Sequence, residues 1–472
     1  MKTLWTSSEV NALFPGNATA PWKAERIVID SRKIEPGDLF VAIKGERHDG
    51  HAFLETSLKQ GAVAAVVSTN SGANIPQVNV ADTMRALETL GIAARKRTRA
   101  KVVGVTGSVG KTSCKEALRL ALGAVGSVYA TEGNLNNHIG VPLTLANLPP
   151  FVDYAVIEMG MNHAGEITPL SKMSAPDAAI ITTVEAVHLE FFDSVDSIAD
   201  AKSEISAGLD KMGTLILPRD NPHFERMRNT AKTKYGITKI VTFGEHPEAD
   251  YRLSDYQPED TGSMLEAILH GTPVRFRIGA VGRHWGVLMM GVLAAVEALG
   301  ADLPQAMLAL ENFKEQKGRG AAEIFSFRSG NVLLVDDSYN ASPASMKAAF
   351  ARMKEIGKAR RKVAVLGDML ELGDSSAQLH QGLKRDLAEN AIDLVFAAGS
   401  YMKNLYDALP ENMRGAYAEK ADMILKPLMA ALEPGDIVLV KGSHGSGMYK
   451  LAEAMQEALR ASAATREHDH AV

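Results

Sequence analysis

The stretch that most constrains this chain is residues 102–113, a short β-branched apolar run that leads into a glycine-rich loop. The loop ends in Gly110, Lys111 and Thr112, and residues 113–122 have the pattern of a helix. A strand, a glycine-rich loop and a helix in this order are typical of a P-loop, which binds phosphate groups. We therefore expect an α/β protein that binds a nucleotide.

Each residue type in the loop has a physical reason. Gly107 and Gly110 allow backbone N–H groups to turn toward a phosphate chain, and the helix N-terminus adds the positive end of its dipole. We expect Lys111 to reach the β- and γ-phosphates and the Thr112 hydroxyl to hold Mg²⁺. The strict pattern has glycine where this chain has Val105, so the loop is a variant. An ordinary glycine-rich turn is the alternative.

Length and composition narrow the class of protein. A chain of 472 residues is long enough for about three domains, and a net charge of −5 gives no sign of a nucleic-acid partner. Cys114 is the only cysteine, which excludes an intramolecular disulfide and fits a reducing compartment. The N-terminus lacks the apolar core of a signal peptide. The longest apolar run, residues 286–296, is too short to span a membrane and predicts a buried helix. We expect a cytoplasmic protein without membrane insertion.

Alternating strands and helices predict three α/β domains. Residues 1–98 precede the P-loop strand and contain short strands. Residues 99–317 surround the P-loop, and residues 318–472 repeat the alternation after a polar, glycine-rich linker at 314–320. This alternation predicts mainly parallel sheets covered by helices on both faces. Ligands of such sheets lie beyond the carboxyl ends of the strands, so the residues after each strand are candidates for a site.

Two candidates follow strands of the central domain. Glu158 ends the apolar strand 153–158, near the P-loop, where a carboxylate is well placed to bind Mg²⁺. A strand-end charge in solvent is the alternative. His188 comes shortly after the next strand, 178–183, and spacing alone does not decide between a structural histidine and a ligand.

A lysine interrupts the apolar face of the following helix. Val195, Ile198, Ile205 and Leu209 lie on one face, and Lys202 fills the gap between Ile198 and Ile205. Lys202 therefore points toward the packed side. Most such lysines extend their ammonium group to water, whereas a buried one needs a charge partner or a chemical change.

Three polar, glycine-rich loops follow strands of the third domain. They are residues 336–343, 367–373 and 441–447. Because the carboxyl ends of parallel strands meet at one edge of a sheet, these loops together predict a binding surface.

Together these strings resemble the Mur ligase family, the ATP-dependent amide ligases of peptidoglycan synthesis, over nearly the whole chain. The matching segments are residues 106–112, 134–137, 139–142, 158–160, 162–166 and 201–205. Residues 336–343 and 366–373 match the members that add D-alanyl-D-alanine to UDP-N-acetylmuramoyl-tripeptide. In the first domain, the family's UDP-sugar half is matched by residues 30–32, 37–42 and 49–51.

The resemblance implies an N-terminal domain that binds the UDP-muramyl-peptide, a central ATPase domain and a C-terminal Rossmann-like domain. It implies that Thr112 and Glu158 bind one Mg²⁺, and that His188 and a carbamylated Lys202 serve a second. Lys111, Lys202 and His188 are then the expected catalytic residues. The implied reaction passes through an acyl phosphate and yields UDP-N-acetylmuramoyl-pentapeptide, ADP and phosphate.

The resemblance also implies which residues contact the substrates. The expected ATP contacts are Thr106, Gly107, Ser108, Val109, Gly110, Lys111, Thr112, Asn136, Arg319, Asp337, Tyr339 and Asn340. The expected contacts of the muramyl peptide are Ser31, Arg32, Asp49, His51 and Asn162. The partners implied are UDP-N-acetylmuramoyl-tripeptide and D-Ala-D-Ala, and we expect a monomer.

The chain departs from the family pattern at three positions. Leu288 stands where the family has an asparagine that contacts adenine, His138 where an acidic residue is common, and His444 where arginine or asparagine is usual. The alternatives are a sibling ligase that adds one amino acid, a folylpolyglutamate-type ligase, and a regulatory P-loop NTPase. Residues 339–343 argue against the first two. An NTPase needs neither the first domain nor the three loops of the third.

Overall fold

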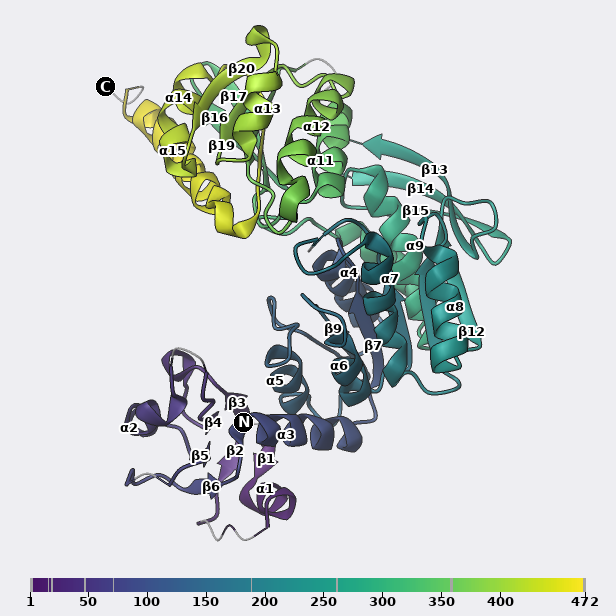
Figure 1. Cartoon of the computed structure of the whole chain (residues 1–472), viewed down its shortest axis with the longest axis vertical. Coiled ribbons are helices and arrows are strands. Elements are labelled where there is room, and N and C mark those ends of the chain that lie inside the picture. Colours follow the sequence, from purple (N-terminus) through teal and green to yellow (C-terminus); the bar gives the residue numbers. More distant parts are fainter. Residues whose placement is uncertain are drawn as a thin grey trace.

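The fold is described from a computed structural model, which covers residues 3–469 except 16, 18–19, 46–47, 71, 188, 260–261 and 357–359. Three α/β units follow one another along the long axis of the molecule, with the central unit between the other two (Figure 1). The predicted three-domain α/β architecture is thus confirmed.

The N-terminal unit has a four-stranded parallel sheet in the order β3-β4-β5-β6. All four residues of β5 are buried, as expected for a parallel strand covered on both faces. The Asp82 side chain caps the N-terminus of α3 by accepting from the Met84 N–H at 2.8 Å. The elements are β1 (Trp5–Thr6), α1 (Ser7–Leu13), β2 (Lys23–Ala24), β3 (Arg26–Val28), η1 (Ser31–Lys33), β4 (Asp38–Val41), η2 (Gly50–Phe53), α2 (Leu54–Lys59), β5 (Ala64–Val67), β6 (Gln77–Asn79) and α3 (Thr83–Arg97).

The central unit has a nine-stranded sheet in the order β15-β14-β13-β12-β11-β10-β7-β9-β8. Its strands are β7 (Lys101–Thr106), β8 (Val128–Ala130), β9 (Tyr154–Glu158), β10 (Ala178–Ile181), β11 (Thr214–Pro218), β12 (Lys239–Gly244), β13 (Tyr251–Glu259), β14 (Gly262–Leu269) and β15 (Thr272–Ile278). The strands from β8 to β13 pair in parallel, whereas β14 and β15 pair antiparallel. The mainly parallel sheet was predicted, but its antiparallel extension was not.

Helices cover both faces of the central sheet. One face packs against α4 (Lys111–Gly123), α9 (Arg283–Ala298) and α10 (Leu303–Ala309). The other packs against α5 (Gly140–Ala146), α6 (Ile167–Ser174), α7 (Val195–Ser203) and α8 (Phe224–Tyr235). The buried helix predicted from the apolar run at 286–296 is α9. The helix predicted through Leu209 ends at Ser203 and continues as the 3-10 helix η3 (Glu204–Gly208).

The C-terminal unit has a six-stranded sheet in the order β16-β17-β21-β18-β19-β20, parallel except for β16. Its strands are β16 (Ala321–Phe327), β17 (Gly330–Asp337), β18 (Lys362–Gly367), β19 (Leu394–Ala398), β20 (Arg414–Ala418) and β21 (Ile437–Lys441). One face packs against α11 (Pro343–Ile356), α12 (Ser376–Glu389) and α13 (Met402–Ala408), and the other against α14 (Leu425–Ala431) and α15 (Met448–Asp469). Within the described ranges, no helix has both the length and the apolarity to cross a bilayer.

Candidate active site

The loop between β7 and α4 has a backbone that requires glycine at two positions. Gly107 has φ +153°, and a Cβ there would lie 1.9 Å from the Thr182 hydroxyl oxygen. Gly110 has φ +83° and immediately precedes α4. Residues that carry a side chain rarely adopt such backbone angles. Both positions therefore need glycine for the loop to fold over the helix N-terminus. The loop therefore has the geometry of a phosphate cradle.

Lys111 lies at the first position of α4 and its ammonium turns back over the loop. Its Nζ donates to the Gly107 carbonyl oxygen at 2.7 Å. Burial lowers the pKa of the Lys111 ammonium, although the charge of Glu158 acts in the opposite direction. A half-buried cation that lines the cavity can exchange this carbonyl partner for phosphate oxygens.

Glu158 lies beside the phosphate loop, with only 1% of its surface exposed. Its Oε1 accepts from the Thr112 hydroxyl at 3.2 Å and from the Asn136 amide at 2.8 Å. Its Oε2 is buried and has no hydrogen-bond partner in the described part of the chain. A buried carboxylate oxygen without a partner is costly, and a hard cation would satisfy it. The carboxylate and the Thr112 hydroxyl thus fit a magnesium ion.

Lys202 is buried as its place on the apolar face predicts, with an exposed fraction of 2%. Among the described residues its ammonium makes no hydrogen bond or ion pair. Burial lowers the pKa of the Lys202 amine well below its usual value, and the charge of Lys111 adds to the shift. The alternative in which Lys202 reaches water is wrong. His188, the other predicted ligand, lies outside the described residues.

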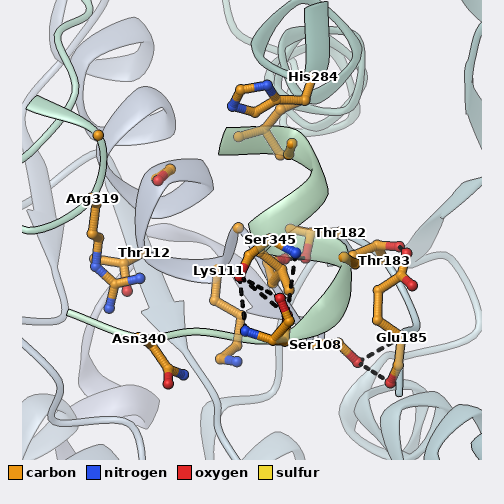
Figure 2. Close-up of a pocket in the computed structure, with 18 of the residues that line it drawn as sticks. Ser108, Lys111, Thr112, Thr182, Thr183, Glu185, His284, Arg319, Asn340 and Ser345 are labelled. Atoms are coloured by element: carbon orange, nitrogen blue, oxygen red, sulfur yellow. Dashed lines mark hydrogen bonds between the residues drawn. The ribbon is translucent and has the colours of Figure 1, made fainter. Parts of the chain in front are cut away.

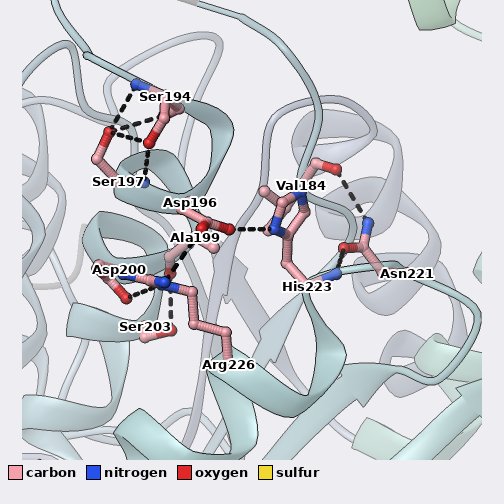
Figure 3. A network of polar contacts seen from close by, with 10 residues as sticks. All are labelled: Val184, Ser194, Asp196, Ser197, Ala199, Asp200, Ser203, Asn221, His223 and Arg226. Carbon is pink, nitrogen blue, oxygen red and sulfur yellow. Dashed lines mark hydrogen bonds and ion pairs between the residues drawn. The ribbon is translucent and has the colours of Figure 1, made fainter.

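A polar network fixes the helix that carries Lys202 (Figure 3). Arg226 of α8 pairs with Asp200 at 2.7 Å and with Asp196 at 3.2 Å, both on α7. His223 Nδ1 lies 2.8 Å from Asp196 as well. These exposed contacts hold α7 against α8 from outside, so the opposite face of α7 stays packed against the sheet with Lys202.

The C-terminal unit contributes the second wall of the site. Lys441, at the end of β21, donates from Nζ to Asp337 at 2.7 Å and to the Asn340 carbonyl at 3.0 Å. Burial raises the pKa of the Asp337 carboxyl, and the Lys441 ammonium opposes that shift. The Arg319 guanidinium lies 4.3 Å from the centre of the Tyr339 ring. Predicted residues from two loops are therefore brought together here.

A cavity of about 780 Å³ joins the two walls (Figure 2). It is lined by most of the predicted ATP contacts, namely Ser108, Val109, Gly110, Lys111, Thr112, Asn136, Arg319, Asp337, Tyr339 and Asn340. Glu158 and Asn162 line it too. Three predicted residues do not line the cavity. Thr106 and Lys202 are buried, and Gly107 packs against Thr182.

The cavity also contains residues that the sequence did not suggest. The Ser108 hydroxyl accepts from the Glu185 N–H at 2.9 Å, which ties the phosphate loop to the segment after β10. Arg352 of α11 pairs with Glu315 at 2.7 Å on the C-terminal wall. Burial lowers the pKa of His284 to about 3, with the charges of Arg352 and Lys441 adding to the shift. The Ser108–Glu185 and Arg352–Glu315 contacts join segments that are far apart in the sequence, so no local sequence pattern could have predicted them.

The predicted substrate residues of the N-terminal unit form a separate group. Arg32 pairs with Asp30 at 2.8 Å, and this hydrogen-bonded pair lowers the pKa of Asp30 to about 2. His51 Nδ1 lies 2.6 Å from Asp49, while its Nε2 accepts from the Ser68 N–H at 2.9 Å. Ser31 begins the 3-10 helix η1 beside Arg32. None of these residues lines the cavity described above.

A phosphate loop that shares a cavity with an open α/β sheet is typical of nucleotide-dependent enzymes. Three family models match the chain in succession. They are the Mur ligase family, catalytic domain, at residues 23–105; the Mur ligase middle domain at 105–296; and the Mur ligase, glutamate ligase domain, at 323–444. The chain belongs to the Mur ligase family.

The most similar proteins reported below belong to one group within the family. The UDP-N-acetylmuramoyl-tripeptide–D-alanyl-D-alanine ligase of Rickettsia prowazekii is 31% identical and matches over 96% of this chain and 100% of its own length. The enzyme of the same name from Bacillus subtilis is 35% identical over 91% of this chain and 93% of its length. A crystal structure of MurF from Acinetobacter baumannii has a TM-score of 0.86 and 33% identity, covering 96% of this chain and 99% of that one.

At 15% identity, one solved structure shares the fold alone. The folylpolyglutamate synthase of Mycobacterium tuberculosis complexed with ADP has a TM-score of 0.62 but only 15% identity, over 79% of this chain and 93% of its own. MurF from Thermotoga maritima, also in complex with ADP, has a TM-score of 0.78 and 28% identity over 92% of this chain and 97% of its own.

Proposed function

We propose that this chain is the ATP-dependent ligase that joins D-Ala-D-Ala to UDP-N-acetylmuramoyl-tripeptide. The products are UDP-N-acetylmuramoyl-pentapeptide, ADP and phosphate. The observation that carries the proposal is the match, over nine-tenths or more of the chain, to relatives named for this activity. The cavity between the phosphate loop and the C-terminal wall supplies the site that such a reaction needs.

The reaction has two steps. The terminal carboxylate of the tripeptide attacks the γ-phosphorus of ATP, ADP leaves, and an acyl phosphate forms. The amine of D-Ala-D-Ala then attacks the acyl carbon and loses a proton, and phosphate leaves. Both early reactants are anions, so the protein must hold together groups that repel each other.

Positively charged side chains of the chain reduce the repulsion between these two anions. Lys111 lies over the phosphate loop, and Arg319 extends from the linker into the same cavity. We assign Lys111 to the transferring phosphoryl group and Arg319 to the nucleotide phosphates. Asp337, Tyr339 and Asn340 approach the nucleotide from the C-terminal wall, so closure of the two units would exclude water from the acyl phosphate.

The unpartnered oxygen of Glu158 supports a magnesium site. We assign the first Mg²⁺ to Thr112 and Glu158, where a bound ion would neutralise phosphate charge. We assign a second Mg²⁺ to His188 and a carbamate on Lys202. The lowered pKa of Lys202 supports this modification, since carbon dioxide reacts with the neutral amine. A carbamate signal from ¹³C-bicarbonate in the wild type, absent in Lys202→Ala, would support the assignment, and its absence from both would contradict it.

The N-terminal unit is assigned to the UDP-muramyl-peptide. Ser31, Arg32, Asp49 and His51 are the proposed contacts there, and Asn162, which lines the cavity, is the proposed contact for the peptide end. The proposed domain boundaries remain 1–98, 99–317 and 318–472. They agree with α3 ending at Arg97 and β16 beginning at Ala321.

Product analysis tests the proposed function. The purified chain is incubated with ATP, Mg²⁺, UDP-N-acetylmuramoyl-tripeptide and D-Ala-D-Ala, and the nucleotide-sugar products are identified by mass spectrometry. We expect the pentapeptide. A product carrying a single amino acid when D-alanine or D-glutamate replaces the dipeptide would instead favour a sibling ligase.

A further inference from the structure

Three rings in a row lie next to Arg319 on the C-terminal wall. The Arg319 guanidinium is 4.3 Å from the centre of the Tyr339 ring, and that centre is 5.4 Å from the centre of the His444 ring. His444 in turn stacks on Tyr449, with the ring centres 4.5 Å apart and the planes 11° from parallel. These distances are typical of attractive ring and cation–π contacts. Tyr339, His444 and Tyr449 therefore form a ring column that connects Arg319 to the first turn of α15.

One end of the ring column reaches the cavity and the other does not. Arg319 and Tyr339 line the cavity that Lys111 lines from the central unit, whereas His444 and Tyr449 are not among its lining residues (Figure 2). Burial lowers the pKa of the Lys111 ammonium, and the charge of Arg319 adds to this shift, so both cations act on the same space. His444 can thus affect a ligand in this cavity through Tyr339 and Arg319.

The orientation of the Arg319 side chain depends on the Tyr339 ring. Among the residues that the structure describes, the Arg319 guanidinium makes no hydrogen bond or ion pair, and its recorded contact is the face of Tyr339. An arginine side chain has many rotamers, and fixing one of them on a ligand costs binding free energy. A ring that already holds the guanidinium reduces that cost. The Tyr339 N–H also donates to the Gly318 carbonyl at 2.9 Å, which fixes the loop beside Arg319.

The Tyr339 ring is only half-buried, so its own position depends on the ring beside it. His444 provides that contact, and Tyr449, which belongs to the long helix α15, packs against His444. The ring nitrogens of His444 make no hydrogen bond within the described ranges. The part that His444 contributes to this wall is therefore the ring, which bridges α15 and Tyr339.

We propose that His444 is a positioning residue for nucleotide binding, which holds the Tyr339 ring so that Arg319 stays directed at the nucleotide phosphates. The inference rests on the proposed function, in which Arg319 binds those phosphates. His444 itself contacts neither the nucleotide nor the dipeptide in this arrangement, because it lies outside the cavity. Its effect on binding therefore requires the Arg319 guanidinium.

The experiment measures the ADP affinity of the full-length chain by calorimetry in a double-mutant cycle. We expect His444→Ala to weaken ADP binding about 5-fold, the cost of a side chain that must be immobilised on binding. In the Arg319→Ala background the same substitution should change the affinity by less than about 2-fold, because the group that it positions is gone. His444→Phe keeps the ring and should stay within about 2-fold of the wild type. Thermal unfolding checks that each variant is folded.

Three results would overturn the inference. The first is an unchanged ADP affinity in His444→Ala, or an equal loss with and without Arg319. The second is a loss in His444→Phe as large as in His444→Ala, since the ring would then not be the group that acts.

The third comes from steady-state kinetics of ligation. We expect His444→Ala to raise the KM for ATP and to leave the KM for D-Ala-D-Ala unchanged. A raised KM for the dipeptide with an unchanged ADP affinity would make His444 a contact of the acceptor instead. If the wild-type chain does not ligate D-Ala-D-Ala, the proposed function fails, but the ADP affinities still decide the role of His444.

Discussion

The central unit meets its two neighbours through very different interfaces. The N-terminal interface is apolar, since Leu143 and Ala146 of α5 belong to the same hydrophobic core as Trp5 and Ile27. The side chain of Asn147 also pairs with the Ile27 backbone, accepting from its N–H at 2.8 Å and donating to its carbonyl at 2.9 Å. Trp5 Nε1 donates to the Ala146 carbonyl at 2.8 Å.

The C-terminal interface is polar and surrounds the cavity. In the described part of the chain, no hydrophobic core is shared by the central and C-terminal units. Direct bonds include the Tyr256 hydroxyl donating to Glu355 at 3.0 Å and the Glu190 N–H donating to the Glu371 carbonyl at 3.4 Å. Thus the first interface packs the N-terminal unit against the central unit through a shared apolar core, whereas the second is polar, and polar interfaces of this kind are the ones that permit relative movement of domains.

The largest effect on turnover is expected at the phosphate loop, which faces the cavity between the central and C-terminal units. Lys111→Ala should lower kcat by about 1,000-fold or more, because it removes the cation over the transferring phosphoryl group. Its unfolding midpoint should stay close to that of the wild type. Steady-state kinetics and thermal unfolding check both points, with Lys232→Ala on the exposed face of α8 as the control. Near-normal turnover in Lys111→Ala would place the chemistry elsewhere.

A second large effect is expected when the charge beside Thr112 is removed. Glu158→Gln keeps the size of the side chain but not the anionic ligand, so we expect the Mg²⁺ affinity to fall by about 100-fold. A titration of activity with Mg²⁺ measures this change, and Glu225→Gln on α8 serves as the matched control. An unchanged Mg²⁺ dependence would remove Glu158 from the metal site.

A substitution at the N-terminal interface should lower the stability of the chain and leave its catalytic activity unchanged. Asn147→Ala removes both bonds to the Ile27 backbone, so the free energy of unfolding should fall by about 2 kcal/mol. Denaturant unfolding measures this loss, and the exposed Asn229→Ala should stay within about 0.5 kcal/mol of the wild type. The KM for ATP should not change. A large rise in that KM with no loss of stability would contradict the separation of the two interfaces.

The smallest effect is expected at the bond between the central and C-terminal units. Tyr256→Phe removes the hydrogen bond to Glu355 and the acceptor for the Gly282 N–H, each of which is worth about 1 kcal/mol or less. We expect a wider spread of distances between labels on the two units and a modestly raised KM for ATP. Tyr154→Phe on β9 is the control. An unchanged distance distribution would show that this bond does not restrain the C-terminal unit.

Local patterns predicted the P-loop, most strand positions and the burial of Lys202. The antiparallel strands β13 to β15 were missed, although Tyr251 and Leu253 alternate with polar residues and His270 and Gly271 form a turn between two strands. The sequence predicted that the loops at 336–343 and 441–447 share one edge of a sheet, but spacing could not predict that Lys441 bonds Asp337 across 104 residues. The early end of α7 has a tertiary cause, since the Glu204 carboxylate bonds the Gly165 N–H at 2.6 Å and the Thr168 N–H at 3.0 Å.

The measurement that tests the account most directly is phosphate release from ATP with UDP-N-acetylmuramoyl-tripeptide, with and without D-Ala-D-Ala. If the cavity holds an acyl phosphate until the dipeptide arrives, sustained release requires both acceptors. We predict steady turnover with both and none with either alone. Release that is indifferent to D-Ala-D-Ala would contradict the assignment as this ligase.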